Sequence, residues 1–193
     1  MKLKLLGAAV LATAVLAALT SSPAMATTLE TKGVAENASV TTKWSLKEHV
    51  VIWRDTFGAT ANTCTVSTVE GNTTSPFTVA DPGTIGGPIT ALSWSNCSEG
   101  NPVVHTKGSL TVQHIAGTTN GTVRSTGLDV TVPSAFGTMR CTTNNTDLGT
   151  INGKKEGSAT LTVAAVLSCT IVGSTITEGL YILTSPSHLG VAA

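Results

Sequence analysis

Apolar and polar residues alternate along several short segments of the chain, and Gly, Asn and Pro separate these segments. The alternation is clearest in residues 63–69, 89–94, 128–132 and 159–163. A period of two places every second side chain on one face, as in β-strands that bury one face. Asn120-Gly121 and Asn152-Gly153 are dipeptides typical of tight hairpin turns, whose two central residues take positive φ. This pattern predicts an all-β fold, either an antiparallel β-sandwich or a jelly-roll-like domain.

Residues 44–57 fit two different elements. Ser45 and Glu48 have the spacing of a helix capping box, and apolar side chains recur on one helical face from Leu46 to Phe57. This pattern predicts a possible short helix at 45–57. The mostly β-branched run from Val50 to Trp53 suits a buried strand instead. We favour the strand because every other predicted element is β.

The first 26 residues have the pattern of a cleaved signal peptide. Lys2 and Lys4 precede an apolar run from Leu5 to Leu19, and Ala24-Met25-Ala26 has the small-x-small form of a cleavage site. The run is too short to span a bilayer comfortably, so we expect no transmembrane segment. Its compact, alanine-rich style suggests a bacterial protein that is secreted to the extracellular space.

The remaining sequence divides into two parts. Residues 27–43 are polar and aperiodic, which predicts a flexible N-terminal arm or a loosely docked strand. Residues 44–193 carry the strand patterns and predict a single β domain, whose length suffices for its own core.

The composition limits the partners of the exported chain. Threonine is the commonest residue, and it favours strands while keeping their outer face polar without charge. Without Lys2 and Lys4, nine Lys and Arg residues face eleven Asp and Glu residues. This weakly charged surface does not suit nucleic acid, which is bound mainly through clustered Lys and Arg. Cell-wall material, a polysaccharide, an apolar surface or a second copy of the chain fits it better.

The four cysteines all follow the predicted signal peptide: Cys64, Cys97, Cys141 and Cys169. An even number of cysteines in an oxidising compartment predicts two disulfides, and no C-x-x-C pair indicates a metal site. Four cysteines allow three pairings, among which the sequence alone does not choose. We favour Cys64–Cys97 and Cys141–Cys169, because each closes a loop of about thirty residues that contributes about 3 kcal/mol.

The chain offers little for catalysis. No serine lies in a G-x-S-x-G elbow, and the four histidines, His49, His105, His114 and His188, are scattered. The acidic residues lie mostly beside turns, where they commonly bond local backbone, so a facing pair of carboxylates is not indicated. We therefore predict no catalytic residue, no metal, no cofactor and no enzymatic activity.

The tryptophans are the best candidates for ligand contact. Trp44 lies near the polar arm, and Trp53 lies in the ambiguous segment, so either could stack on a sugar. Packing in the core is the alternative for all three tryptophans, and it is favoured for Trp94 within its alternating strand.

The cysteine-bounded strands also carry a resemblance. Cys64-Thr65-Val66, Gly71 and the run from Ile89 to Cys97 resemble small secreted actinobacterial β-proteins. These are related to the activators of alkane oxidation, a family linked to biofilm matrix. The resemblance covers roughly residues 64–169 and implies a secreted β fold, without implying any functional residue.

These observations predict a secreted, non-enzymatic protein of the cell surface or extracellular matrix. It would contact apolar or cell-wall material, or associate with itself through exposed strand edges. A carbohydrate-binding module is the first alternative, and it requires exposed aromatic side chains. A small secreted hydrolase is the second, and it requires a histidine bonded to a serine or an acid.

Overall fold

A computed structural model describes residues 27–31, 34–35, 39–47, 51–55, 57–73, 84–170 and 173–192. The predicted signal peptide, residues 1–26, lies outside the described residues. The described chain forms strands in this order: β1 (Thr28–Thr31), β2 (Val34–Ala35), β3 (Thr41–Leu46), β4 (Val51–Asp55), β5 (Thr60–Asn72), β6 (Thr84–Cys97), β7 (Val103–Thr106), β8 (Ser109–His114), β9 (Gly121–Thr126), β10 (Asp129–Ser134), β11 (Gly137–Thr142), β12 (Thr146–Asn152), β13 (Thr160–Cys169), β14 (Gly173–Ser185) and β15 (Gly190–Ala192).

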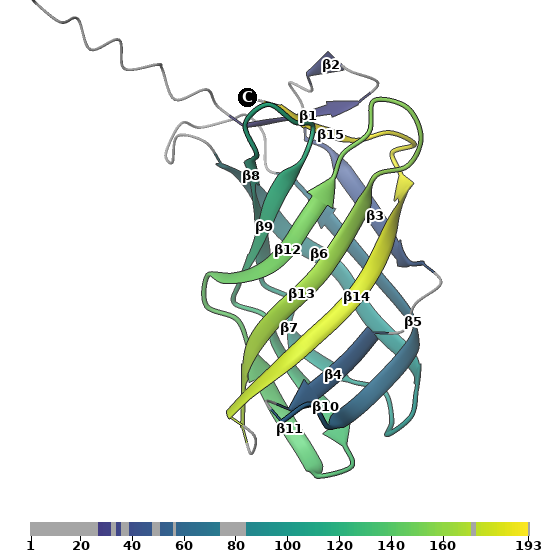
Figure 1. The fold of residues 1–193 in the computed structure, drawn as a ribbon, viewed down its shortest axis with the longest axis vertical. Coiled ribbons are helices and arrows are strands. Elements are labelled where there is room, and N and C mark those ends of the chain that lie inside the picture. The colour runs from purple at the N-terminus through teal and green to yellow at the C-terminus, as the bar shows by residue number, and fades with distance from the viewer. Residues whose placement is uncertain are drawn as a thin grey trace, which may run out of the picture.

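Eight strand positions close into a barrel (Figure 1). Seven positions are filled by β5, β6, β8, β9, β12, β13 and β14, each hydrogen-bonded to the next. β3 and β4 together fill the eighth position, because both pair with β14 on one side and with β5 on the other. The sheet therefore returns onto itself.

The closed barrel changes the predicted architecture. The all-β prediction is confirmed, but the described strands form a barrel instead of a two-layered sandwich or jelly roll. Both architectures alternate inward apolar and outward polar residues, so the strand pattern does not separate them. On β13, for example, Leu161, Ala165 and Leu167 are buried inside the barrel, while Thr162 and Val166 are exposed.

The N-terminal residues form strands where the structure describes them. Residues 27–43 were expected to form a flexible arm or a loosely docked strand, and among them Thr28–Thr31 forms β1 and Thr41 begins β3. Leu29 is buried, which anchors β1. For 45–57, the described residues form β3 and β4 and no helix, so the strand interpretation is confirmed there. In the described part of the chain, no helix has the length and apolar character that a membrane span requires.

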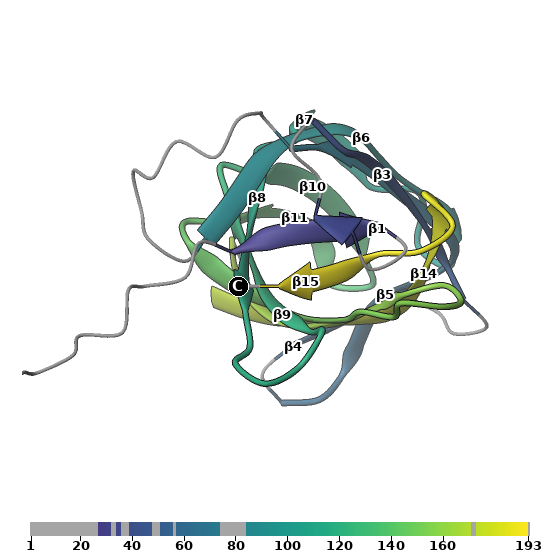
Figure 2. The same cartoon turned by 90° about the horizontal axis from the view of Figure 1, so that it is seen from above.

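Two additions extend the barrel at its opposite ends. β1 pairs with β15 and β2 and lies across one mouth of the barrel, as Figure 2 shows from above. We call this three-stranded sheet the lid. At the other end, which we call the base, β10 and β11 continue the β9–β12 hairpin, and β7 pairs with β10.

Both disulfides join neighbouring strands near the base. Cys64–Cys97 links β5 to β6, and Cys141–Cys169 links β11 to β13. The Cα atoms are 4.0 Å apart in each pair, as for directly opposed residues of adjacent strands. The favoured pairing is confirmed, and the described residues include no free cysteine. Two disulfides indicate an oxidising environment.

Candidate functional site

The interior of the barrel contains a cavity of about 70 Å³, which we call the central cavity. Inward-facing apolar side chains from several strands form most of its wall, including Val51, Val69, Ile89, Val130, Ala165 and Leu167. An eight-stranded barrel is just wide enough to be filled by side chains or to hold one small ligand. An engineered apolar cavity of about 150 Å³ binds benzene. The central cavity is smaller, so it takes a molecule of the size of benzene only if its wall moves apart.

Small residues in the wall leave this space open. Ala165 and Gly179 lie on the neighbouring strands β13 and β14 and both line the cavity. A Cβ atom at position 179 would lie 3.2 Å from the Tyr181 ring and 3.3 Å from Val51, closer than usual contacts. The glycine therefore lets these side chains pack against the backbone of β14.

Two tryptophans form an aromatic wall of the central cavity. The rings of Trp53 on β4 and Trp94 on β6 meet edge to face, with their centroids 5.5 Å apart. This arrangement is favoured for aromatic pairs because the positive edge of one ring meets the negative face of the other. The pair fixes a broad, rigid apolar surface inside the barrel.

Three residues that line the cavity carry buried polar atoms without a hydrogen-bond partner in the described structure. These atoms are Trp53 Nε1, Trp94 Nε1 and Thr177 Oγ1. Trp53 is only 1% exposed and Thr177 only 7%, and their backbones are paired across β4 and β14. An unsatisfied buried polar group costs about 1–3 kcal/mol, so a hydrogen-bond acceptor that reached this wall would relieve the cost.

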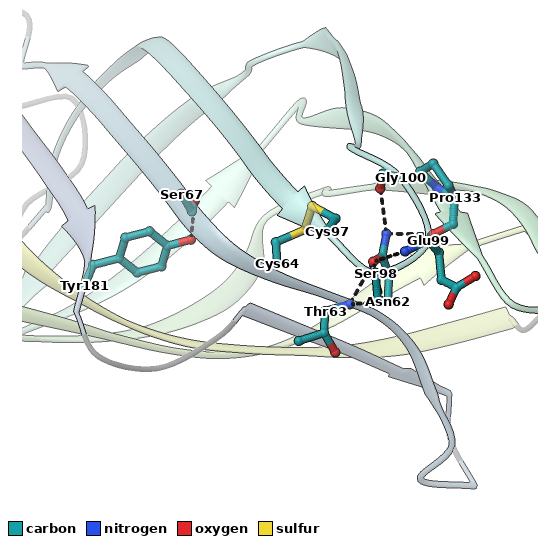
Figure 3. Close-up of a disulfide and its surroundings, with 10 residues drawn as sticks. All are labelled: Asn62, Thr63, Cys64, Ser67, Cys97, Ser98, Glu99, Gly100, Pro133 and Tyr181. Atoms are coloured by element: carbon teal, nitrogen blue, oxygen red, sulfur yellow. Dashed lines mark hydrogen bonds between the residues drawn. A yellow bond between two sulfur atoms is a disulfide. The ribbon is translucent and has the colours of Figure 1, made fainter.

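A fourth polar group in the wall is already satisfied. The hydroxyls of Tyr181 and Ser67 are hydrogen-bonded at 2.8 Å, as Figure 3 shows. Burial raises the pKa of Tyr181, and the Ser67 hydroxyl and the nearby Trp94 indole oppose this rise only in part. Tyr181 therefore stays neutral, and its hydroxyl holds β14 to β5.

A second cavity of about 50 Å³, the upper cavity, lies between the central cavity and the lid. Trp44, Ile85, Val112 and Val123 form part of its wall, and Leu29 and Leu189 close it from the lid side. Leu110 and Leu161 line both cavities, so these two side chains form the partition between them.

Asn62 closes the base of the barrel (Figure 3). Its Nδ2 group donates hydrogen bonds to the carbonyl oxygens of Gly100, at 3.0 Å, and Pro133, at 2.9 Å. Its Oδ1 atom accepts bonds from the backbone amides of Thr63 and Glu99 and from the Ser98 hydroxyl. One buried side chain thus joins β5 to the β6–β7 turn and to the end of β10.

The structure places the predicted ligand-contact tryptophans inside the barrel. Trp53 lines the central cavity and Trp44 the upper cavity, and both are buried. Neither ring is available to stack on an external polysaccharide. Trp53 and Trp44 therefore contact only a molecule that enters the barrel.

The described histidines form no catalytic pair. His105 contacts the Thr131 hydroxyl, and His114 and His188 contact backbone carbonyl oxygens. His49 lies outside the described residues. Among the described residues, no group of three or more His, Cys, Asp or Glu side chains is placed to hold a metal ion.

Exposed apolar side chains gather at the base. Phe57 is 94% exposed in the β4–β5 turn, and Phe136 is half exposed in the β10–β11 turn. Asp55 Oδ1 accepts a hydrogen bond from the Phe57 amide, and Ser134 Oγ accepts one from the Phe136 amide. Each phenyl ring is therefore carried by a residue whose amide is hydrogen-bonded within its turn. Ala135 of the second turn donates to the Ala61 carbonyl, which places the turns at the same end.

The sequence did not reveal Thr177 and Tyr181 as wall residues, or Ser67 as the hydrogen-bond partner of Tyr181. Thr177 and Ser67 belong to residue types that are abundant along the whole chain. Tyr181 is the only tyrosine, and this rarity was the one signal that could have singled it out.

Comparisons of the chain with models of protein families, with curated proteins and with solved structures found no match. The resemblance to small secreted actinobacterial β-proteins therefore stays a prediction.

Proposed function

We propose that this protein is a non-enzymatic extracytoplasmic binding protein, which holds a small, mostly apolar molecule inside its barrel. The observation that carries the proposal is the central cavity, an apolar space lined by Trp53 and Thr177, whose Nε1 and Oγ1 atoms are buried without a hydrogen-bond partner in the described structure. An indole N–H only donates hydrogen bonds, and a threonine hydroxyl can donate. The bound molecule therefore carries a hydrogen-bond acceptor, such as a carbonyl oxygen, on an apolar frame.

Two observations support an extracytoplasmic location. The pattern of residues 1–26 predicts export, and the two disulfides fit an oxidising compartment outside the cytoplasm. Secretion brings the barrel into contact with small apolar molecules of the medium or the cell wall.

The buried tryptophans favour this proposal over a surface carbohydrate-binding module. Such a module needs aromatic rings exposed on one face, whereas Trp44, Trp53 and Tyr181 are each less than 5% exposed. The histidine contacts likewise provide no support for a hydrolase, since each described histidine bonds a hydroxyl or a backbone carbonyl.

A matched pair of ligands tests the proposal. Cyclopentanone and cyclopentane have similar frames, but only the ketone has an acceptor. We expect the oxidised protein to bind the ketone more tightly in a titration followed by tryptophan fluorescence and by NMR. Equal affinity for both molecules would contradict the role of the polar wall, and no binding of either would contradict the proposed function.

Two threonine variants locate the contact. Thr177→Val removes the unpartnered hydroxyl and keeps the side-chain shape, and we expect it to weaken ketone binding about two- to tenfold, the value of one hydrogen bond. Thr175→Val is the control, because Thr175 is buried two residues away on β14 but does not line the cavity. Equal weakening of ketone binding by the two substitutions would contradict a contact between the ketone and Thr177.

Phe57 and Phe136 support a second candidate function, which is attachment to apolar surfaces through the base. Their turns present uncharged apolar tips at one end of the barrel. We expect Phe57→Ser and Phe136→Ser to reduce adsorption of the protein to hexadecane droplets. Val166→Ser is the control, because Val166 is 58% exposed on the side of the barrel. Equal loss in the control would contradict attachment through the base.

A further inference from the structure

We infer that the ligand of this barrel is a linear molecule, with an acceptor at one end and an alkyl chain that runs along the barrel axis. This inference rests on the proposed function and names the class of its ligand. The relative positions of the two cavities, their partition and the unpartnered polar atoms all favour such a shape.

The two cavities lie in line within the barrel. The central cavity reaches from Ala165 and Leu167 on β13 up to Leu161 on the same strand. The upper cavity continues from Leu161 to Leu29 in the lid and to Leu189, which directly precedes β15. A compact molecule fills one cavity, whereas a linear molecule fills both.

Two leucine side chains lie between the cavities. Leu110 on β8 and Leu161 on β13 line both spaces. Leucine side chains occupy a few staggered rotamers, so a change of rotamer opens the partition without moving the strands. Leu110 is only partly buried, which leaves it less constrained than Leu161.

The polar atoms mark one end of the combined space. Thr177 pairs with Ala165, and Tyr181 pairs with Leu161 at the level of the partition. The separation of four residues along β14 corresponds to about 13 Å of strand. The unpartnered hydroxyl of Thr177 therefore lies on the base side of the partition.

The upper cavity is mostly apolar at the other end. Its lining includes the polar residues Thr42, Asn72 and Thr73, of which Asn72 and Thr73 bond to Ser39 and Val40. Leu29, Trp44, Ile85 and Leu189 supply apolar surface around the remaining space. The geometry thus places the acceptor of the ligand near Thr177 and Trp53, and the alkyl tail beneath the lid.

A series of linear ketones from 2-butanone to 2-octanone tests this inference on the oxidised protein. We expect the affinity to rise about fourfold for each added methylene, the value for burial of one such group, until the tail meets the lid. We also expect 2-hexanone to bind more tightly than cyclohexanone, which has the same number of carbons in a compact ring. An affinity that does not rise with chain length, or tighter binding of the ring, would overturn the inference.

Two valine-to-phenylalanine variants distinguish the contributions of the two cavities to binding. Val112 lines only the upper cavity and Val163 only the central cavity. We expect Val112→Phe to lower the affinity for 2-octanone to that of the short ketones, while 2-butanone binds as before. Val163→Phe should weaken every member of the series. Equal effects of Val112→Phe on short and long ketones would overturn the inference.

The wild-type series distinguishes the two levels of the proposal and needs no variant to fold. No binding of any ketone would overturn the proposed function and, with it, this inference. Binding without a dependence on chain length would overturn the linear ligand alone.

Discussion

Replacement of Asn62 by alanine tests how the base of the barrel is closed. Asn62 is completely buried and makes five hydrogen bonds, which reach the β6–β7 turn and the end of β10. The Asn62→Ala variant leaves the carbonyl oxygens of Gly100 and Pro133 without this donor. We expect the turn and β10 to loosen from β5.

The expected loss follows from the number of bonds. Each contributes about 0.5–1.5 kcal/mol, and Thr63 keeps a second contact with the Ser98 hydroxyl, so the free energy of unfolding should fall by about 3–5 kcal/mol. Domains of this kind are stable by about 5–15 kcal/mol, so the variant should fold with much reduced stability.

Urea denaturation of the oxidised protein measures this loss. Asn120→Ala is the matched control, because the Asn120 side chain accepts one hydrogen bond, from the Gly153 amide at 3.1 Å. We expect the control to lose only about 1 kcal/mol. A loss in Asn62→Ala no larger than in the control would refute the role of Asn62 in closing the base.

Three further predictions concern the wall, the base and pH. Thr177→Val should raise the free energy of unfolding by about 1 kcal/mol because it removes an unsatisfied buried hydroxyl, whereas Thr175→Val should change it little; equal changes in urea denaturation would contradict this. Replacement of Cys141 and Cys169 by alanine should lower hydrogen-exchange protection in β10 and β11 more than loss of the other disulfide, because β11 and β13 share only two residue pairs. Burial raises the pKa of Tyr181, so its contribution to stability is present below about pH 10 and is lost as the pH rises through the folded-state pKa. Since Tyr181 is the only tyrosine, near-ultraviolet absorbance should show tyrosinate only as the protein unfolds; tyrosinate in the folded protein near pH 10 would contradict this.

Local sequence signals predicted the strands and the disulfides well. Alternation around Leu161 and Val163 correctly indicated a half-buried strand, because a period of two depends only on neighbouring residues. The cysteine spacing also led to the observed pairs. Each cysteine pair closes a short loop, and the strands on either side of that loop lie next to each other.

Closure of the barrel could not be predicted from the same signals. It depends on β3 and β4 pairing with β14, and the paired residues Trp44 and Leu183 lie far apart in the sequence. Alternation reports which face of a strand is buried, but it does not report which strand lies beside it. The sandwich and jelly-roll predictions were equally consistent with the strand pattern.

The hairpin signal at Asn120-Gly121 was correct in its strands and wrong in its turn. β8 and β9 are joined there, but the chain turns through Gly117, which has a φ of 75°, and Asn120 is not among the positive-φ residues. The Asn120 side chain instead accepts a bond from the Gly153 amide. The second Asn-Gly pair, at residues 152 and 153, does lie between two antiparallel neighbours, β12 and β13. A Cβ atom at position 153 would lie 2.0 Å from the Thr119 carbonyl oxygen, so a glycine there also lets this loop approach the β8–β9 loop.

The candidate site was only partly visible in the sequence. Trp53 was identified as a possible ligand contact, but on the assumption that its ring was exposed. Burial of Trp53 depends on its pairing with β14, which again is a contact distant in sequence. Thr177 could not be identified because its role depends on a hydroxyl left unpartnered by packing, in a chain where threonine is the commonest residue.

A crystal structure of the oxidised protein with bound 2-hexanone would show directly whether the barrel holds its ligand inside. We expect the ketone inside the barrel, with its oxygen within hydrogen-bond distance of Thr177 Oγ1 or Trp53 Nε1. Its alkyl chain should point past Leu110 toward the lid. A ketone bound only on the outer surface, with the central cavity unchanged, would contradict the account.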